Sequence, residues 1–102
     1  MFTYSEDCLF LNIWVPDGAE CAPVLFYIHG GAFTSGCGHE KHFDPAAWCR
    51  KGVIAVTCNY RLGVLGFSNF EQARTADTCG NYGLFDQIAA LTWVKDNIAN
   101  FG

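Results

Sequence analysis

Two glycines that directly follow an apolar run are the residues with the clearest chemical use in this sequence. The segment His29-Gly30-Gly31-Ala32-Phe33 comes after residues 24–28, whose uninterrupted hydrophobicity predicts a buried strand. Because glycines carry no side chains, the backbone N–H groups of such a loop can point into a cavity. N–H groups aimed at one point stabilise the negative charge that develops on an attacked ester carbonyl oxygen. The segment therefore looks like half of an oxyanion hole, in which Gly31 and Ala32 would donate N–H groups and Gly30 would shape the turn.

A plain glycine turn is the alternative interpretation, and it would be the better one for an isolated Gly-Gly pair. The Cβ atom of Ala32 limits the geometry of the loop. A positive φ costs a residue with a Cβ atom about 1–2 kcal/mol. We therefore expect a negative φ at Ala32 and any left-handed residue at Gly30 or Gly31.

Three apolar runs predict the strands that must position this loop. They are residues 9–15, 24–28 and 53–58, and the last two are continuous enough for strands covered on both faces. A short helix is expected between them, because Asp44 can cap its start and Gly52 can end it. A strand, a helical connection and another buried strand form the βαβ unit of a parallel sheet.

The last predicted element is a helix over residues 84–98. Its first turn is expected to include Asp86, where the helix dipole favours a carboxylate. An apolar face at helical spacing should pack on the sheet, and it consists of Leu84, Ile88, Leu91 and Ile98. The long connection 59–83 is also expected to be packed, on account of Leu62, Val64, Leu65 and Phe67. The elements together predict an α/β fold with a mostly parallel sheet and flanking helices.

Composition limits the possible partners. With 102 residues the chain forms one domain or less, and its 51% hydrophobic content suits the interior of a larger protein. A net charge of −4 leaves no basic patch, so we expect no nucleic-acid partner. Every apolar run is far shorter than the roughly 18 residues of a membrane-spanning helix. The first residues show no signal peptide, which leaves the compartment open with a lean towards the cytoplasm.

The six cysteines and a His-containing segment raise the questions of disulfides and metals. The cysteines have diffuse spacing and no C-x-x-C motif, so we expect them to be reduced and mainly structural. No zinc-binding spacing is met by Cys37, His39, His42 and Cys49. The glycines at 31, 36 and 38 match no phosphate-binding loop. We therefore expect no metal and no nucleotide cofactor.

Four separated segments share their order and spacing with a known family. They are residues 5–12, the loop 29–33, Asn59-Tyr60-Arg61-Leu62-Gly63 with Gly66-Phe67, and residues 80–87. With residues 93–98 and Phe101-Gly102 they cover nearly the whole chain, and together they resemble the type-B carboxylesterase and cholinesterase family. Many members have a third glycine at the position of Ala32, and the alanine is similar to that of bacterial p-nitrobenzyl esterases.

The resemblance implies that residues 1–102 are the N-terminal part of an α/β-hydrolase domain that hydrolyses small carboxylic esters through a serine acyl-enzyme. In this family the serine lies on a G-x-S-x-G elbow beyond the equivalent of Gly102, and the acid and histidine follow it. The chain therefore lacks the nucleophile and the rest of the triad, and we expect it to be inactive alone. The segment Gly66-Phe67-Ser68-Asn69-Phe70 begins like such an elbow, but Phe70 replaces the final glycine that the turn requires, so we do not expect Ser68 to be the nucleophile.

The resemblance also implies roles for four other residues. His29 is expected to steady the loop, because the catalytic histidine of the family comes late in the chain. Phe33 is expected to line or support the acyl pocket, or simply to pack in the core. Arg61 and Asp86 should form a buried salt bridge with an architectural role, which would cost around 3–5 kcal/mol to break.

Two other functions stay open at this stage. Cholinesterase-like adhesion proteins keep the fold, lack the nucleophile and act by binding partners. A truncated and non-functional chain is the third interpretation. The residues that follow Gly102 would distinguish the three, since only the enzyme requires a serine on the elbow.

Overall fold

The computed structural model describes residue 5 and residues 7–38, 43–67 and 81–102. Its elements in chain order are β1 (Leu11–Trp14), β2 (Val24–Tyr27), α1 (Pro45–Arg50), β3 (Ile54–Cys58), α2 (Gly63–Phe67), α3 (Tyr82–Asn97) and the 3-10 turn η2 (Ile98–Phe101). Every strand and helix expected from the sequence is present, and each strand is shorter than its apolar run. The short helix α2 was not expected. Ser68, His39, His42 and Cys79 lie outside the described residues.

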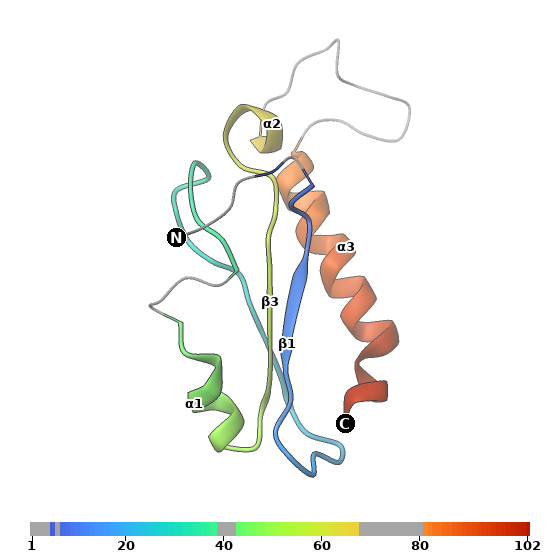
Figure 1. Cartoon of the computed structure of the whole chain (residues 1–102). Coiled ribbons are helices and arrows are strands. Elements are labelled where there is room, and N and C mark those ends of the chain that lie inside the picture. The colour runs from blue at the N-terminus through green and yellow to red at the C-terminus, as the bar shows by residue number, and fades with distance from the viewer. Residues whose placement is uncertain (1–4, 6, 39–42, 68–80) are drawn as a thin grey trace.

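The three strands form one sheet in the order β1-β3-β2, with β3 at its centre (Figure 1). β2 and β3 run parallel, with Val24 opposite Ile54, which confirms the predicted βαβ unit. β1 is antiparallel to β3, with Leu11 opposite Cys58. The described sheet is therefore mixed, rather than mostly parallel as the sequence suggested. All residues of β3 are buried, as expected for a central strand covered on both faces.

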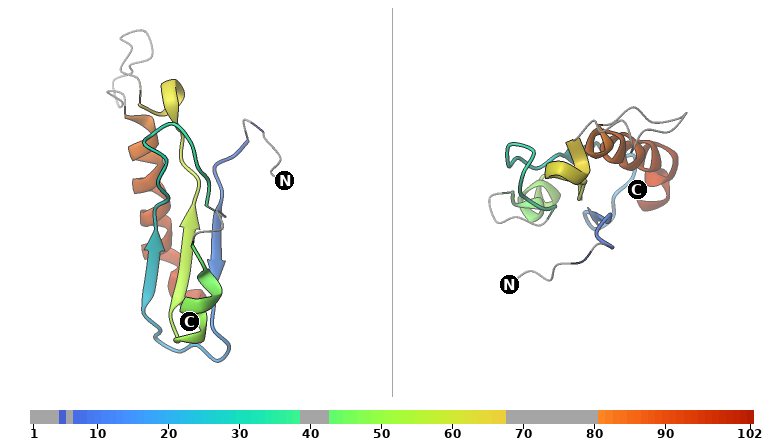
Figure 2. Two further views of the ribbon diagram at one scale, coloured as in Figure 1. Left: turned by 90° about the vertical axis from the view of Figure 1, so that its left-hand side faces the viewer. Right: turned by 90° about the horizontal axis from the view of Figure 1, so that it is seen from above.

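Helices cover both faces of this sheet, since α1 lies in front of the strands and α3 behind them (Figure 2, left). Alternate residues of β3 point to the two sides. On one side Ile54 and Val56 pack against Val94 of α3 and form the core. The apolar residues around this core are Ile13, Val15, Ala22, Phe26 and Ile98.

The helix α1 is formed by the signals that predict it. Asp44 is the N-cap, and its carboxylate accepts a hydrogen bond from the N–H of Ala47 at 3.3 Å. Pro45 occupies the first helical position, and Arg50 lies in the last turn, where a cation interacts favourably with the helix dipole. Gly52 has φ +80° and ends the segment.

The face that α3 turns towards the sheet is not the predicted one. Of the predicted face, Ile98 packs against the core, but Leu84, Ile88 and Leu91 are about half exposed. The buried residues of α3 are Gly83 and Val94. Gly83 explains the rotation, because a Cβ at this position would lie 2.3 Å from the carbonyl oxygen of Arg61. Only a glycine lets the start of α3 approach this segment so closely.

Two further expectations fail in the same region. α3 begins at Tyr82, so Asp86 lies outside the first turn. Val64 and Leu65 are largely exposed, whereas Phe67, which was also expected to be packed, is turned inward together with Gly66. Hydrophobic spacing identified the apolar residues, but it did not show which of them contact the rest of this chain.

The cysteine prediction is confirmed where the structure describes the residues. Cys8, Cys21, Cys49 and Cys58 form no disulfide. Cys58 lies in the central strand, where burial, together with the nearby Asp86, raises the pKa of its thiol to about 11. Cys58 is therefore a small structural residue and not a reactive one.

Candidate functional site

The loop His29–Phe33 leaves the sheet at the carboxyl end of β2 and turns at once (Figure 1). The carbonyl oxygen of Gly31 accepts hydrogen bonds from the N–H of Thr34 at 3.0 Å and the N–H of Ser35 at 3.2 Å. The hydroxyl of Thr34 donates to the same oxygen at 3.0 Å. This carbonyl is therefore held from several directions.

The backbone of this turn is left-handed at three successive residues. φ is +134° at Gly31, +53° at Ala32 and +66° at Phe33. The positive φ expected at Gly30 or Gly31 is thus found at Gly31, but the negative φ predicted for Ala32 is wrong. A turn with two positive central φ values has the hand of a type I′ turn. Its strain, about 1–2 kcal/mol for each non-glycine residue, is offset by the hydrogen bonds to the Gly31 carbonyl.

The carbonyls of His29 and Gly30, which precede the turn, also accept hydrogen bonds, one from Tyr60 and the other from the His29 ring. The side chain of His29 is 2% exposed, and its Nδ1 lies 2.9 Å from the carbonyl oxygen of Gly30. Because that oxygen only accepts, Nδ1 carries the proton. The hydroxyl of Tyr60 donates to the carbonyl of His29 at 2.7 Å, and the two rings stack at 4.4 Å. His29 therefore steadies the loop, as expected.

The direction of the loop's N–H groups follows from these carbonyl contacts. In a trans peptide the C=O of one residue and the N–H of the next point in opposite directions. Fixing the carbonyls of Gly30 and Gly31 therefore fixes the N–H groups of Gly31 and Ala32. Among the described residues, neither of these N–H groups donates a hydrogen bond. Gly31 and Ala32 are both exposed in this chain.

A second contact holds the far end of the loop. The carbonyl oxygen of Phe33 accepts a hydrogen bond from the N–H of Gly63 at 2.6 Å. The Phe33 ring meets Phe67 edge to face at 4.8 Å and is 63% exposed. Phe33 is thus not a core residue here, and its role in an acyl pocket stays a prediction.

Asn59 makes structural contacts that sequence reasoning did not single out. Its side-chain oxygen accepts from the N–H of Gly38 at 2.7 Å, and its amide group donates to the carbonyl of Cys8 at 2.9 Å. Its own N–H donates to the carbonyl of Phe10 at 3.0 Å. Asn59 thus joins three chain segments. A polar residue directly after a buried strand, within one of the family segments, was the signal that could have found it.

The predicted pair of Arg61 and Asp86 is present. The Nε and Nη2 atoms of Arg61 donate to the two carboxylate oxygens at 2.8 Å each, and the N–H of Arg61 adds a third bond at 2.9 Å. The hydrogen bond to Asp86 raises the pKa of Arg61 above its usual value. The side chain of Asp86 is 9% exposed and that of Arg61 is 41% exposed. The bridge is therefore only partly buried, which corrects the expectation of a buried one.

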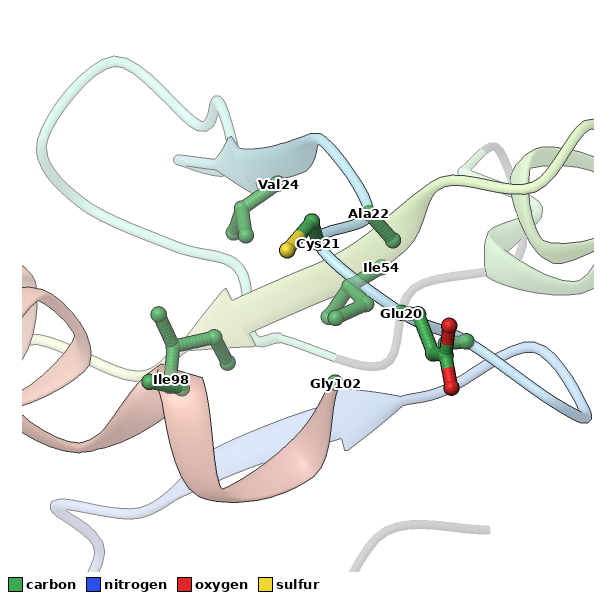
Figure 3. A pocket seen from close by; sticks show the side chains of 9 residues that line it. Glu20, Cys21, Ala22, Val24, Ile54, Ile98 and Gly102 are labelled. Atoms are coloured by element: carbon green, nitrogen blue, oxygen red, sulfur yellow. The ribbon is translucent and has the colours of Figure 1, made fainter.

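A pocket lies at the opposite end of the sheet, where β2 and β3 begin (Figure 3). Its volume is about 540 Å³. The lining is mainly apolar, and it consists of Ala19, Glu20, Cys21, Ala22, Val24, Ile54, Ile98, Ala99 and Gly102. The pocket is far from the loop and holds no set of groups suited to ester chemistry.

Neither a cluster of metal ligands nor a membrane-spanning helix occurs in the described part of the chain. No group of three metal-ligating side chains comes together among these residues. Within the same residues, no helix is long and apolar enough to cross a membrane.

Comparison with known proteins identifies the class to which this fold and loop belong. A family model described as the carboxylesterase family matches residues 1–102. The chain belongs to this family. The carboxylesterase EST55 of Geobacillus stearothermophilus superposes on it with a TM-score of 0.86 at 46% identity, over 96% of this chain and 21% of that one.

Individual relatives extend this likeness. The para-nitrobenzyl esterase of Bacillus subtilis is 48% identical over 103 residues, which is 96% of this chain and 20% of the relative. Gut esterase 1 of Caenorhabditis elegans is 52% identical over 99 residues, 95% of this chain and 17% of the relative. Fumonisin B1 esterase of Sphingopyxis macrogoltabida is 45% identical over 103 residues, 96% of this chain and 19% of the relative. The chain spans about a fifth of the length of these proteins.

Proposed function

We propose that the complete protein is a serine-type carboxylic ester hydrolase, and that Gly30, Gly31 and Ala32 form part of its oxyanion hole. The single observation that carries this proposal is the loop's hydrogen bonding. The carbonyls of Gly30 and Gly31 accept bonds from the loop itself, and the N–H groups of Gly31 and Ala32 donate to no described residue. Membership of the carboxylesterase family supports the same reaction.

The reaction would use these N–H groups at the moment when charge develops. The oxygen of a serine hydroxyl, from a part of the protein outside these residues, bonds to the ester carbonyl carbon and gives its proton to a histidine. The C=O π electrons move to the carbonyl oxygen, which becomes an anion held by the N–H groups of Gly31 and Ala32. Collapse of this intermediate breaks the bond to the alcohol, which leaves with the histidine's proton. Water then releases the acid from the acyl-serine by the same two steps.

The loop suits this role because its donors are fixed before the reaction begins. Prealigned donors need no reorganisation when the charge forms, and losing one donor typically costs about 3–4 kcal/mol of transition-state stabilisation. A loop strained at Ala32 and Phe33 persists only where the surroundings hold it. Here those surroundings are the contacts of His29, Tyr60 and Gly63.

The substrates would be small, neutral or moderately apolar carboxylic esters. The relatives carry the names of para-nitrobenzyl and fumonisin B1 esterases, so proteins similar in this region are named for different esters. This variety fits a loop that contacts only the carbonyl oxygen common to all esters. The selection of acyl and alcohol groups would then depend on other parts of the complete protein.

The test is a burst experiment on the complete protein with p-nitrophenyl acetate. We expect about one equivalent of p-nitrophenol in the burst, as the acyl-enzyme mechanism requires, and loss of that burst after treatment with a fluorophosphonate. A folded complete protein that shows neither a burst nor labelling by the fluorophosphonate would contradict the proposal. The 102-residue chain alone should show no serine-dependent turnover, since it lacks the elbow.

A further inference from the structure

The loop's orientation depends on a residue that is outside the loop and about thirty positions later in the sequence. Tyr60 is buried and follows β3, and its hydroxyl is 2.7 Å from the carbonyl oxygen of His29. Its ring stacks on the ring of His29, with 4.4 Å between centroids and 18° between planes. Phe67 meets the Tyr60 ring at 6.3 Å and 88°. The Tyr60 side chain is thus fixed by packing and contacts His29 in two ways.

His29 links Tyr60 to the peptide between Gly30 and Gly31, which carries the first proposed donor, the N–H of Gly31. The ring held by Tyr60 places Nδ1 on the carbonyl oxygen of Gly30. That carbonyl and the N–H of Gly31 belong to one peptide plane and point in opposite directions. The position of the His29 ring therefore sets the direction of the Gly31 N–H.

Space around this hydrogen bond is closed by Gly36. A Cβ at Gly36 would lie 2.4 Å from Nδ1 of His29 and 2.6 Å from the carbonyl oxygen of Gly30. The His29 ring is therefore confined between Tyr60 and the backbone of Gly36. Among the described residues, Nε2 of His29 has no hydrogen-bond partner, so the ring is held by Nδ1 and by stacking.

We propose that Tyr60 is a positioning residue for ester hydrolysis, acting through His29 on the N–H of Gly31. This inference rests on the proposed oxyanion hole and extends it to a relay of three residues. Tyr60 touches no substrate. It acts by keeping the strained loop in the one conformation that aims its donors, so its loss should affect the transition state more than the bound substrate.

The main test is Tyr60→Phe in the complete protein, which keeps the stacked ring and removes only the hydroxyl. We expect kcat to fall about tenfold. This effect lies between that of losing one ordinary hydrogen bond and that of losing an oxyanion-hole donor. KM should change by less than about twofold, since the ester ground state hardly uses the hole. Affinity for a trifluoromethyl ketone, which binds as an oxyanion, should fall in parallel with kcat. Rates are normalised to the sites that react with a fluorophosphonate, so unfolded protein does not count.

Tyr27→Phe is the matched control, because Tyr27 ends β2 just before the loop, but its ring stacks on Phe43 at 4.1 Å rather than on His29. It should leave kcat, KM and ketone affinity at the wild-type values. An unchanged kcat in Tyr60→Phe, or an equal loss in Tyr27→Phe, would overturn the positioning role. A wild-type protein that no fluorophosphonate labels would instead remove the proposed function on which the inference rests.

A second variant tests the relay directly and also covers a failure of Tyr60→Phe to fold. His29→Phe keeps a ring against Tyr60 and removes the Nδ1 donor to Gly30. We expect the same selective loss of kcat, and in the double variant a combined loss smaller than the product of the two single losses, since both act on the same peptides. Wild-type kcat in His29→Phe, or independent multiplication of the two losses, would refute the relay.

Discussion

The two ends of β2 use their backbone in opposite ways. At its carboxyl end, successive carbonyls of His29, Gly30 and Gly31 accept hydrogen bonds from a tyrosine, a histidine and the turn itself. At its amino end, Val24 borders an apolar pocket of about 540 Å³. The carboxyl end of β2 is therefore held by directional hydrogen bonds, and the amino end mainly by burial of apolar side chains. Substitutions that change a side chain by only one or a few atoms should therefore lower kcat strongly at the loop and hardly at the pocket.

The largest effect is expected from Gly36→Ala. Gly36 has φ +119°, and a Cβ there would collide with the Nδ1 of His29 and the carbonyl of Gly30. The added methyl must displace the hydrogen bond that orients Gly31. We expect kcat per labelled site to fall about 100-fold, the lower range for loss of an oxyanion donor.

Gly52→Ala is the matched control for that experiment. Gly52 also has a positive φ, +80°, but a Cβ there would meet nothing within 4 Å. Backbone strain should lower the free energy of unfolding, measured with urea, by about 1–2 kcal/mol. The value of kcat should not change. If Gly52→Ala lowered kcat as much as Gly36→Ala, backbone strain alone would explain the loss of activity. The comparison between the two ends of β2 would then fail.

Asp86→Asn should affect stability rather than catalysis. The neutral amide loses the charged fork with Arg61, which is partly exposed, so we expect a loss of about 2 kcal/mol, below the range for a fully buried pair. A lower Tm with kcat per labelled site within about threefold of wild type would confirm the architectural role. A larger effect on kcat than on Tm would show that the bridge belongs to the site.

Asp44→Asn provides the same chemical change on the surface. Asp44 lies 3.6 Å from Arg50, and both side chains are mostly exposed. Asparagine caps a helix about as well as aspartate, and exposed ion pairs contribute little. The Tm should therefore stay close to that of wild type. A fall equal to that of Asp86→Asn would indicate a general response to lost charge.

The two regions also differ in what the sequence could predict. The apolar runs predicted the strands, and helical spacing predicted α3, because both depend on local periodicity. The capping residues Asp44 and Gly52 predicted α1. The φ of Ala32 was predicted wrongly, because the cost of its Cβ is local whereas the bonds to the Gly31 carbonyl arise from the whole turn. The face of α3 was wrong because it depends on the contact of Gly83 with Arg61, which no periodicity shows.

Within the site, the pairing of Arg61 with Asp86 came from family resemblance and not from spacing. The contacts of Tyr60 and Asn59 were missed, although both residues stand in a segment that carries the resemblance. Their partners, His29 and Cys8, are 31 and 51 positions away in the sequence. These contacts become visible only once the strands are paired, because β2 beside β3 brings His29 to Tyr60, and β1 beside β3 brings Cys8 to Asn59.

A pH-dependent effect is expected from Cys58, at the centre of the sheet. Burial raises the pKa of its thiol to about 11, from 9.0. Between these values the unfolded chain releases the proton while the folded chain keeps it, so stability falls as pH rises from 9 towards 11. Cys58→Ala should flatten this part of the curve of unfolding free energy against pH. An equally steep curve in the variant would assign the alkaline loss to other groups.

The smallest effect is expected at the pocket, from Glu20→Gln. Glu20 is exposed and lines the pocket, and it lies at the opposite end of β2 from the loop. If the pocket only serves packing, removing its charge should leave kcat and KM for p-nitrophenyl acetate at the wild-type values. If the pocket bound the ester instead, KM would change while kcat stayed constant, because lost ground-state binding acts on KM alone. The ratio of the effect on KM to the effect on kcat therefore separates a substrate pocket from a packing surface, and we expect neither quantity to move.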